Sequence, residues 1–306
     1  MSAVFDDAVA TVLSARARDV DGFAVGRVLP AVEQRSVGPF VFFDHMGPGF
    51  APPGPGLDVR PHPHIGLATV TALFAGEIVH RDSLGNEQVI RPGEVNWMIA
   101  GRGIVHSERT SPERRASGQE MHGLQLWVAL PDEHEEDEPE FAHHPTADLP
   151  PIEGRAYRGR VLAGTAFGLT SPVAIRSPMF YVQAEIEAGG VMPVPEGYRE
   201  RAVYVASGRL EIAGRAIEPR QMVVLREGAR EVRAIEDAQL VLLGGEPVGP
   251  RHVWWNLVSS RASRIAEAAR MWDEQRFPLV PGDEVERIPL PTTLRLPAPF
   301  AGEVSS

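Results

Sequence analysis

Glycine and proline interrupt this chain at short intervals, and no other feature of the sequence limits its fold as strongly. There are 30 glycines and 28 prolines, and they separate short apolar runs such as "FAVGRVLP", "EQVIRPGEVNWMIAG" and "GLQLWVALP". Because Gly and Pro favour turns and break helices, apolar runs of this length between them are typical of β-strands. The pattern predicts an all-β protein built as an antiparallel sandwich or barrel.

The second half of the chain repeats the pattern of the first half. The segment "VYVASGRLEIAGRAIEPRQMVVLREG" resembles "VTALFAGEIVHRDSLGNEQVIRPGEVNWMIAG", and Gly208 matches Gly76 at an offset of about 130 residues. A proline-rich segment, residues 143–154, lies between the two copies. We therefore expect two similar β-domains, at residues 1–145 and 146–306.

One segment near the C-terminus carries a helical pattern. Residues 259–277, "SSRASRIAEAARMWDEQRF", are rich in Ala, Glu and Arg, and Pro278 follows them. Four apolar side chains recur at i, i+3, i+4 and i+7, the spacing of one helix face: Ile265, Ala268, Ala269 and Trp272. We expect a short helix here, as the end of the second domain.

Composition excludes several classes of protein. The chain has no cysteine, which rules out disulfide scaffolds, thiolate zinc sites and iron–sulfur clusters and leaves His, Asp and Glu as metal ligands. A net charge of −11 does not favour binding to nucleic acid. The first 20 residues place acids before any basic residue and hold only a short apolar run, so we expect neither a signal peptide nor a membrane span. A cytoplasmic protein is the resulting expectation.

Two pairs of potential metal ligands have a spacing of one intervening residue. His62 and His64 flank a proline ahead of a strand-like run, and His106 and Glu108 follow a Gly-x-Gly turn. In an extended segment, side chains at i and i+2 leave the same face, so each pair can point at one ion. Either pair alone is read most simply as surface residues beside a turn. Together, three imidazoles and one carboxylate favour a site for a first-row transition metal.

Other histidines and acids have plainer interpretations. His122 lies on the apolar face of its strand and can point inward near the site. A histidine packed in the core, rather than a metal ligand, is the favoured interpretation. Asp44 and His45 are neighbours on a strand and point to opposite faces, which favours structural roles. We expect His80 near the barrel surface, with no role. The acidic run "DEHEEDEPE" at 132–140 is interpreted as a solvated connection.

Three motifs in the first β-domain carry a resemblance to a known family. "PHPH", "GEIVHRDS" and "RPGEVNWMIAGRGIVHSE" resemble motifs of the pirin family within the cupin superfamily. The resemblance runs over most of the chain, from "RSVGPFVFFDHMGP" to "FPLVPGDEVERIPLP". It implies two tandem cupin barrels, each a double-stranded β-helix, to which the helical pattern adds a short C-terminal helix. It also implies one metal in the first barrel and none in the second, which lacks matching ligands.

The resemblance also implies a cofactor and two possible functions. The expected cofactor is Fe(II), with Mn, Ni, Co, Cu or Zn as alternatives, held by His62, His64, His106 and Glu108. Some members of the family cleave the flavonol quercetin with dioxygen, whereas the animal pirins are described as nuclear, iron-dependent regulators. The chain is therefore either a quercetin 2,3-dioxygenase-type oxygenase with a flavonol-like aromatic substrate, or a non-enzymatic regulatory module with a protein partner. In the oxygenase, Glu108 is the expected catalytic base for the flavonol hydroxyl.

One position departs from the family pattern. The general cupin motif and several pirins carry a glutamate four residues after the second histidine, where this chain has Ala68. The missing acid favours the regulatory interpretation slightly and leaves Glu108 as the carboxylate near the metal. Val70, Trp97 and Ile99 are candidates to shape a dry substrate pocket, provided that their strands turn them inward.

Overall fold

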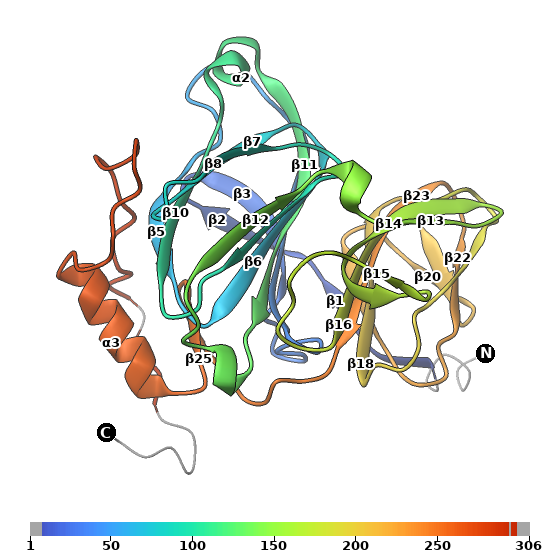
Figure 1. The fold of residues 1–306 in the computed structure, drawn as a ribbon. Helices are drawn as coiled ribbons and strands as arrows, with labels where there is room; N and C mark the ends of the chain where they lie inside the picture. The colour runs from blue at the N-terminus through green and yellow to red at the C-terminus, as the bar shows by residue number, and fades with distance from the viewer. Residues whose placement is uncertain (1–7, 294, 299–306) are drawn as a thin grey trace. The chain divides into compact units, whose positions relative to one another are not determined.

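The chain forms two compact units whose segments alternate along the sequence. The computed structural model describes residues 8–293 and 295–298 (Figure 1). Of these, the first-barrel unit contains residues 19–24, 46–143, 248–293 and 295–298, and the second-barrel unit contains residues 8–18, 25–45 and 144–247. Each unit is described by itself below.

The second-barrel unit consists of two antiparallel sheets. The larger sheet has the order β1 (Val9–Ser14), β21 (Gln221–Leu225), β18 (Glu200–Ser207), β23 (Ala238–Gly245), β16 (Met179–Ile186), β14 (Tyr157–Ala166) and β13 (Pro151–Glu153), with β15 (Leu169–Thr170) paired to β14. The smaller sheet has the order β17 (Val191–Pro193), β22 (Glu231–Ala234), β19 (Leu210–Ile212) and β20 (Arg215–Ile217). Alternate residues of β16, from Phe180 to Ile186, lie in the apolar core, as the two-residue period of a strand requires.

The first barrel has two sheets and, late in the sequence, a short separate hairpin. The larger sheet contains β12 (Glu140–His144), β9 (Val95–Ile99), β6 (Leu67–Ala75) and β11 (Gln119–Ala129) in that order, and the strands β4 (Phe40–Ala51), β3 (Phe23–Leu29) and β2 (Arg16–Val20) are each divided between the two units. The smaller sheet has the order β5 (Val59–His64), β10 (Ile104–Arg109), β7 (Ile78–Asp82) and β8 (Glu87–Ile90), and the hairpin pairs β24 (His252–Trp254) with β25 (Leu257–Ser259). The strands of the smaller sheet are all antiparallel neighbours. The predicted all-β class is confirmed.

The predicted C-terminal helix is confirmed as α3 (Ala262–Asp273). Its four expected core residues are buried in a cluster that also contains Ile65 and Val105 of the first barrel. Shorter helical segments are α2 (Pro112–Ser117), η1 (Asp132–His134) and η2 (Thr146–Asp148). Among the described residues, no helix has both the length and the apolar character needed to cross a bilayer.

The placement of α3 differs from the expected order of domains. The chain leaves the first-barrel unit between residues 143 and 144, next to the predicted boundary at 145, but returns to it at residue 248. The helix groups with the first barrel because its apolar face packs on Ile65 and Val105. As domain limits, 1–145 and 146–306 stay a prediction.

Candidate metal centre

Three of the four predicted ligands converge in the smaller sheet of the first barrel. His62 and His64 lie on β5 and His106 lies on the adjacent strand β10, where His106 is directly opposite His62 (Figure 1). All three side chains are buried, and each offers one ring nitrogen within 4.8 Å of the others. The Nε2 atoms of His64 and His106 are 3.1 Å apart. Antiparallel pairing of two strands, each with inward residues at i and i+2, is what brings these rings together.

Backbone carbonyls fix the ring orientation of the two histidines on β5. The Nδ1 atom of His62 lies 2.8 Å from the carbonyl oxygen of Arg60, and Nδ1 of His64 lies 2.8 Å from the carbonyl oxygen of Asn256. A carbonyl oxygen only accepts hydrogen bonds, so both Nδ1 atoms carry the proton. The Nε2 atom of each neutral ring is then a bare lone pair, which is the form that binds a metal.

A side chain, His80, holds the third histidine. The Nδ1 atoms of His106 and His80 are 3.4 Å apart, and Nε2 of His80 lies 3.0 Å from Oδ2 of Asp82. The prediction that His80 lies near the barrel surface is wrong, because its ring is buried and contacts a candidate ligand. The sequence did hold a usable signal, since His80 and Asp82 repeat the i, i+2 spacing of the ligand pairs.

The electrostatic environment keeps the three candidate ligands neutral. Burial lowers the pKa of His62 to about 4. Burial, followed by the charges of neighbouring histidines, lowers the pKa values of His64 and His106 well below the usual value. The Nε2 atoms of His64 and His106 face each other at 3.1 Å, a separation that suits two nitrogen donors bound to one ion at about 2.0–2.1 Å. The chemistry of this donor set therefore fits a first-row transition metal.

The fourth predicted ligand, Glu108, is near the group but not in it. It lies two residues after His106 on β10, opposite His80 of β7, so its side chain leaves the sheet on the same face as His106. The pairing of β10 with β5 shifts between His106 and Glu108. Burial raises the pKa of Glu108 to about 7. The role of Glu108 as a ligand stays a prediction.

One face of the larger sheet is turned toward the histidines. The ring centroid of Trp127 is 5.1 Å from that of His64, in an edge-on contact. Trp127 is paired with Thr69 across β11 and β6, and paired residues of neighbouring strands have side chains on the same face. The face that carries Thr69 and Trp127 therefore borders the metal centre.

The opposite face of the sheet carries Val70, Trp97 and Ile99, whose direction the sequence left open. Ala68 is paired with Ile99, and Val70 with Trp97. Because these residues alternate with Thr69, their side chains leave the other side of the sheet. The proposed pocket wall of Val70, Trp97 and Ile99 therefore points away from His64. A glutamate at position 68 would also point away from the histidines, so Ala68 removes no acid from the metal centre.

The remaining candidates have structural partners. Asp44 accepts two hydrogen bonds of 2.8 Å from the guanidinium of Arg27. Nδ1 of the adjacent His45 lies 2.5 Å from the hydroxyl of Tyr204. The two neighbours bind different groups, as expected for side chains on opposite faces. His122 is buried, and its ring centroid lies 4.5 Å from that of Phe74.

One residue of the acidic run is not solvated. Glu135 is 4% exposed, and its carboxylate lies 2.9 Å from Nε of Arg251. It also accepts hydrogen bonds from the backbone N–H of Ser260 and from the hydroxyls of Ser259 and Ser260. The interpretation of the run as a solvated connection is therefore wrong for Glu135, which anchors the segment after β25.

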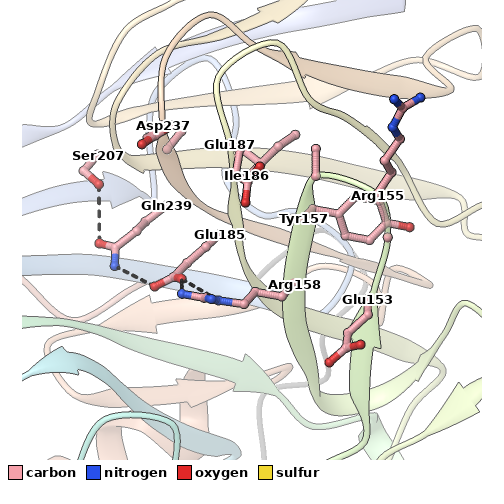
Figure 2. A pocket seen from close by; sticks show the side chains of 13 residues that line it. Glu153, Arg155, Tyr157, Arg158, Glu185, Ile186, Glu187, Ser207, Asp237 and Gln239 are labelled. Atoms are coloured by element: carbon pink, nitrogen blue, oxygen red, sulfur yellow. Dashed lines mark hydrogen bonds and ion pairs between the residues drawn. The ribbon is translucent and has the colours of Figure 1, made fainter.

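A surface pocket of about 590 Å³ in the second-barrel unit has a different chemistry (Figure 2). Its polar side chains bind one another: Arg158 pairs with Glu185 at 2.8 Å, and Glu185 accepts a hydrogen bond from Gln239. No histidine lines it. The pocket therefore offers no set of converging donors comparable to the histidines of the first barrel.

Comparisons with known proteins cover both barrels. Residues 22–128 match the family model described as Pirin, and residues 181–278 match the Pirin C-terminal cupin domain. The chain is 51% identical over 284 residues to a pirin-like protein of Caulobacter vibrioides, covering 92% of this chain and 98% of that one. It is 33% identical over 248 residues to pirin of Homo sapiens, covering 78% and 82%.

A solved structure agrees with the sequence matches. The crystal structure of quercetin 2,3-dioxygenase from Acinetobacter baumannii has a TM-score of 0.84 and 35% identity, covering 93% of this chain and 97% of that one. The expected pair of cupin domains with a short C-terminal helix is thereby confirmed. Because both halves of the chain match the family models and the relatives match over most of their length, this chain belongs to the pirin family.

Proposed function

We propose that this chain is a metal-dependent oxygenase of the quercetin 2,3-dioxygenase type, acting on a flavonol-like substrate. The observation that carries the proposal is the convergence of three buried, neutral imidazoles, from His62, His64 and His106, on one point. The crystallised relative at 35% identity is named a quercetin 2,3-dioxygenase. Fe(II) is the proposed metal, with Mn, Ni, Co, Cu or Zn as alternatives that the same nitrogen donors can bind.

The metal and the protein side chains would have separate roles in the reaction. A metal held by the three histidines would lower the pKa of the flavonol hydroxyl and supply redox chemistry toward dioxygen. Glu108 would accept the hydroxyl proton on its carboxylate, because it shares the inward face with His106. Trp127, edge-on to His64, would limit the space beside the site and exclude water.

The proposal is tested by elemental analysis of protein purified without added metal, followed by anaerobic loading with Fe(II) and an oxygen-electrode assay with quercetin. About one metal per chain and oxygen uptake above background would support it. Oxygen uptake at background with fully loaded protein would overturn the oxygenase. That result would instead favour the other expectation, a metal-dependent regulatory module that binds a protein partner.

Replacing Glu108 by glutamine should separate proton transfer from metal binding. Glu108→Gln keeps the size of the side chain but cannot take a proton, so oxygen uptake should fall by about 10²–10⁴-fold. Metal content should stay near that of the wild type if the three histidines suffice to hold the metal, and a fall in metal content would support the prediction that Glu108 is also a ligand. The matched control is Glu87→Gln, since the Glu87 carboxylate is 63% exposed and pairs with Arg81 on the surface. Unchanged oxygen uptake in Glu108→Gln would remove Glu108 from the mechanism.

A further inference from the structure

The contacts of His80 form a continuous chain of buried side chains that ends at a candidate ligand. His80 lies between Asp82 and His106, with separations of 3.0 Å and 3.4 Å between the nearest atoms. Its ring also stacks on Phe141, with the ring centroids 4.3 Å apart and the planes within 10°. Asp82 is fully buried and His80 is 5% exposed. The ring of His80 is therefore held on three sides.

The hydrogen bonds around Asp82 decide where the proton of His80 lies. The carboxylate of Asp82 accepts from the backbone N–H groups of Leu84 and Asn86 and from the side-chain amide of Asn86. These donors favour the ionised form, which can only accept. Nε2 of His80 must then donate to Asp82, so Nδ1 of His80 is the ring atom that faces Nδ1 of His106.

The same reasoning extends to His106. A metal at Nε2 of His106 needs the ring proton on Nδ1, and Nδ1 of His80, 3.4 Å away, is placed to accept that proton. The Nε2 atom of His106 is then bare and faces Nε2 of His64 at 3.1 Å. Backbone carbonyls impose the matching tautomer on His62 and His64. His106 differs from them, because its tautomer depends on a side chain that a substitution can change.

We propose that His80 is a positioning residue, which, oriented by Asp82, holds His106 in the tautomer that presents Nε2 to the metal. The inference rests on the metal site of the proposed function. A group in this position orients the ligand and increases its basicity, and its loss typically costs about 10–100-fold in metal affinity. Packing of the His80 ring on Phe141 is the competing explanation for its burial.

Two substitutions separate hydrogen bonding from packing. His80→Phe keeps an aromatic ring against Phe141 but removes the acceptor for His106. His80→Asn loses the ring but places an amide oxygen near the position of Nδ1. If His80 positions the ligand, His80→Phe should weaken Co(II) binding by about 10–100-fold, and His80→Asn should retain most of the affinity. If the ring of His80 only packs on Phe141, His80→Asn should lose more Co(II) affinity than His80→Phe.

The affinity is measured by competition of Co(II)-loaded protein with a chelator, and Co(II) absorption bands report the coordination. The matched control is His122→Phe, which replaces another buried histidine that contacts a phenylalanine and should leave the affinity unchanged. Thermal unfolding of each variant monitors the fold.

A second readout needs no metal. Nitrogen-15 NMR of the metal-free protein should find His106 protonated at Nδ1 in the wild type and in His80→Asn, and shifted toward Nε2 protonation in His80→Phe. The same tautomer in His80→Phe and the wild type would overturn the inference. Failure of the wild type to bind Co(II) would instead overturn the proposed function, so the two failures are distinguishable.

Discussion

His64→Ala should abolish stoichiometric metal binding and, with it, oxygen uptake with quercetin. His64 is one of the three converging histidines: its Nε2 atom is 3.1 Å from that of His106, and its Nδ1 atom is fixed by the carbonyl oxygen of Asn256. Removing it leaves two of the three nitrogen donors. Loss of a residue that only orients a ligand costs up to about 100-fold in metal affinity. Because His64 is itself a proposed ligand, we expect its loss to cost more than about 100-fold.

The measurement is elemental analysis of the purified variant after anaerobic Fe(II) loading and removal of excess metal. His122→Ala is the matched control, because His122 is also a buried histidine of the first barrel but is not in the converging group. Thermal unfolding should show that both variants keep a folded structure. Metal content unchanged from the wild type in His64→Ala would refute the proposed ligand set.

Gly66→Ala should destabilise the first barrel and weaken metal binding at the same time. Gly66 follows His64 by two residues and has a φ of +66°, and an added Cβ would overlap the carbonyl oxygen of Val258. A left-handed alanine alone costs about 1–2 kcal/mol, and relieving the overlap adds about 1–3 kcal/mol. The strand segment at Val258 would have to move, and Asn256, whose carbonyl holds His64, is part of the same hairpin.

The control for this substitution isolates the backbone cost. Gly214 has a φ of +80°, and an added Cβ there would meet no atom within 4 Å. Gly214→Ala should therefore lower the unfolding temperature less than Gly66→Ala and leave metal affinity unchanged. Thermal unfolding and chelator competition on the two variants check the prediction. Equal shifts in unfolding temperature, or full metal affinity in Gly66→Ala, would show that the close approach of Val258 does not support the site.

Local patterns in the sequence predicted much of the fold correctly. Turn residues between short apolar runs predicted the strands, and the spacing of Ile265, Ala268, Ala269 and Trp272 predicted the helix and its buried face. These features depend on neighbours within a few residues, because strand and helix periods are local. The sequence did not reveal that α3 packs on the first barrel, since that depends on a match between two apolar surfaces from distant segments.

The candidate site was also predicted only in part from the sequence. The i, i+2 spacing identified His62, His64 and His106, and it placed Glu108 on the face of His106. The spacing alone did not indicate which face of β6 borders the site, so the direction of Val70 stayed open until the strand pairing was known. The face became known only through the pairing of Thr69 with Trp127 and the contact of Trp127 with His64.

The sequence by itself therefore determined the strands, the helix and the residue types that can bind a metal, because these follow from side-chain chemistry and from periods of two and 3.6 residues. Only the tertiary structure decided how the ligands are oriented. The carbonyl that holds His64 belongs to Asn256, 192 residues away along the chain, and His106 is held by His80 on the neighbouring strand. The physical reason is that a hydrogen bond depends on atoms meeting within about 3 Å, which strand register and packing decide.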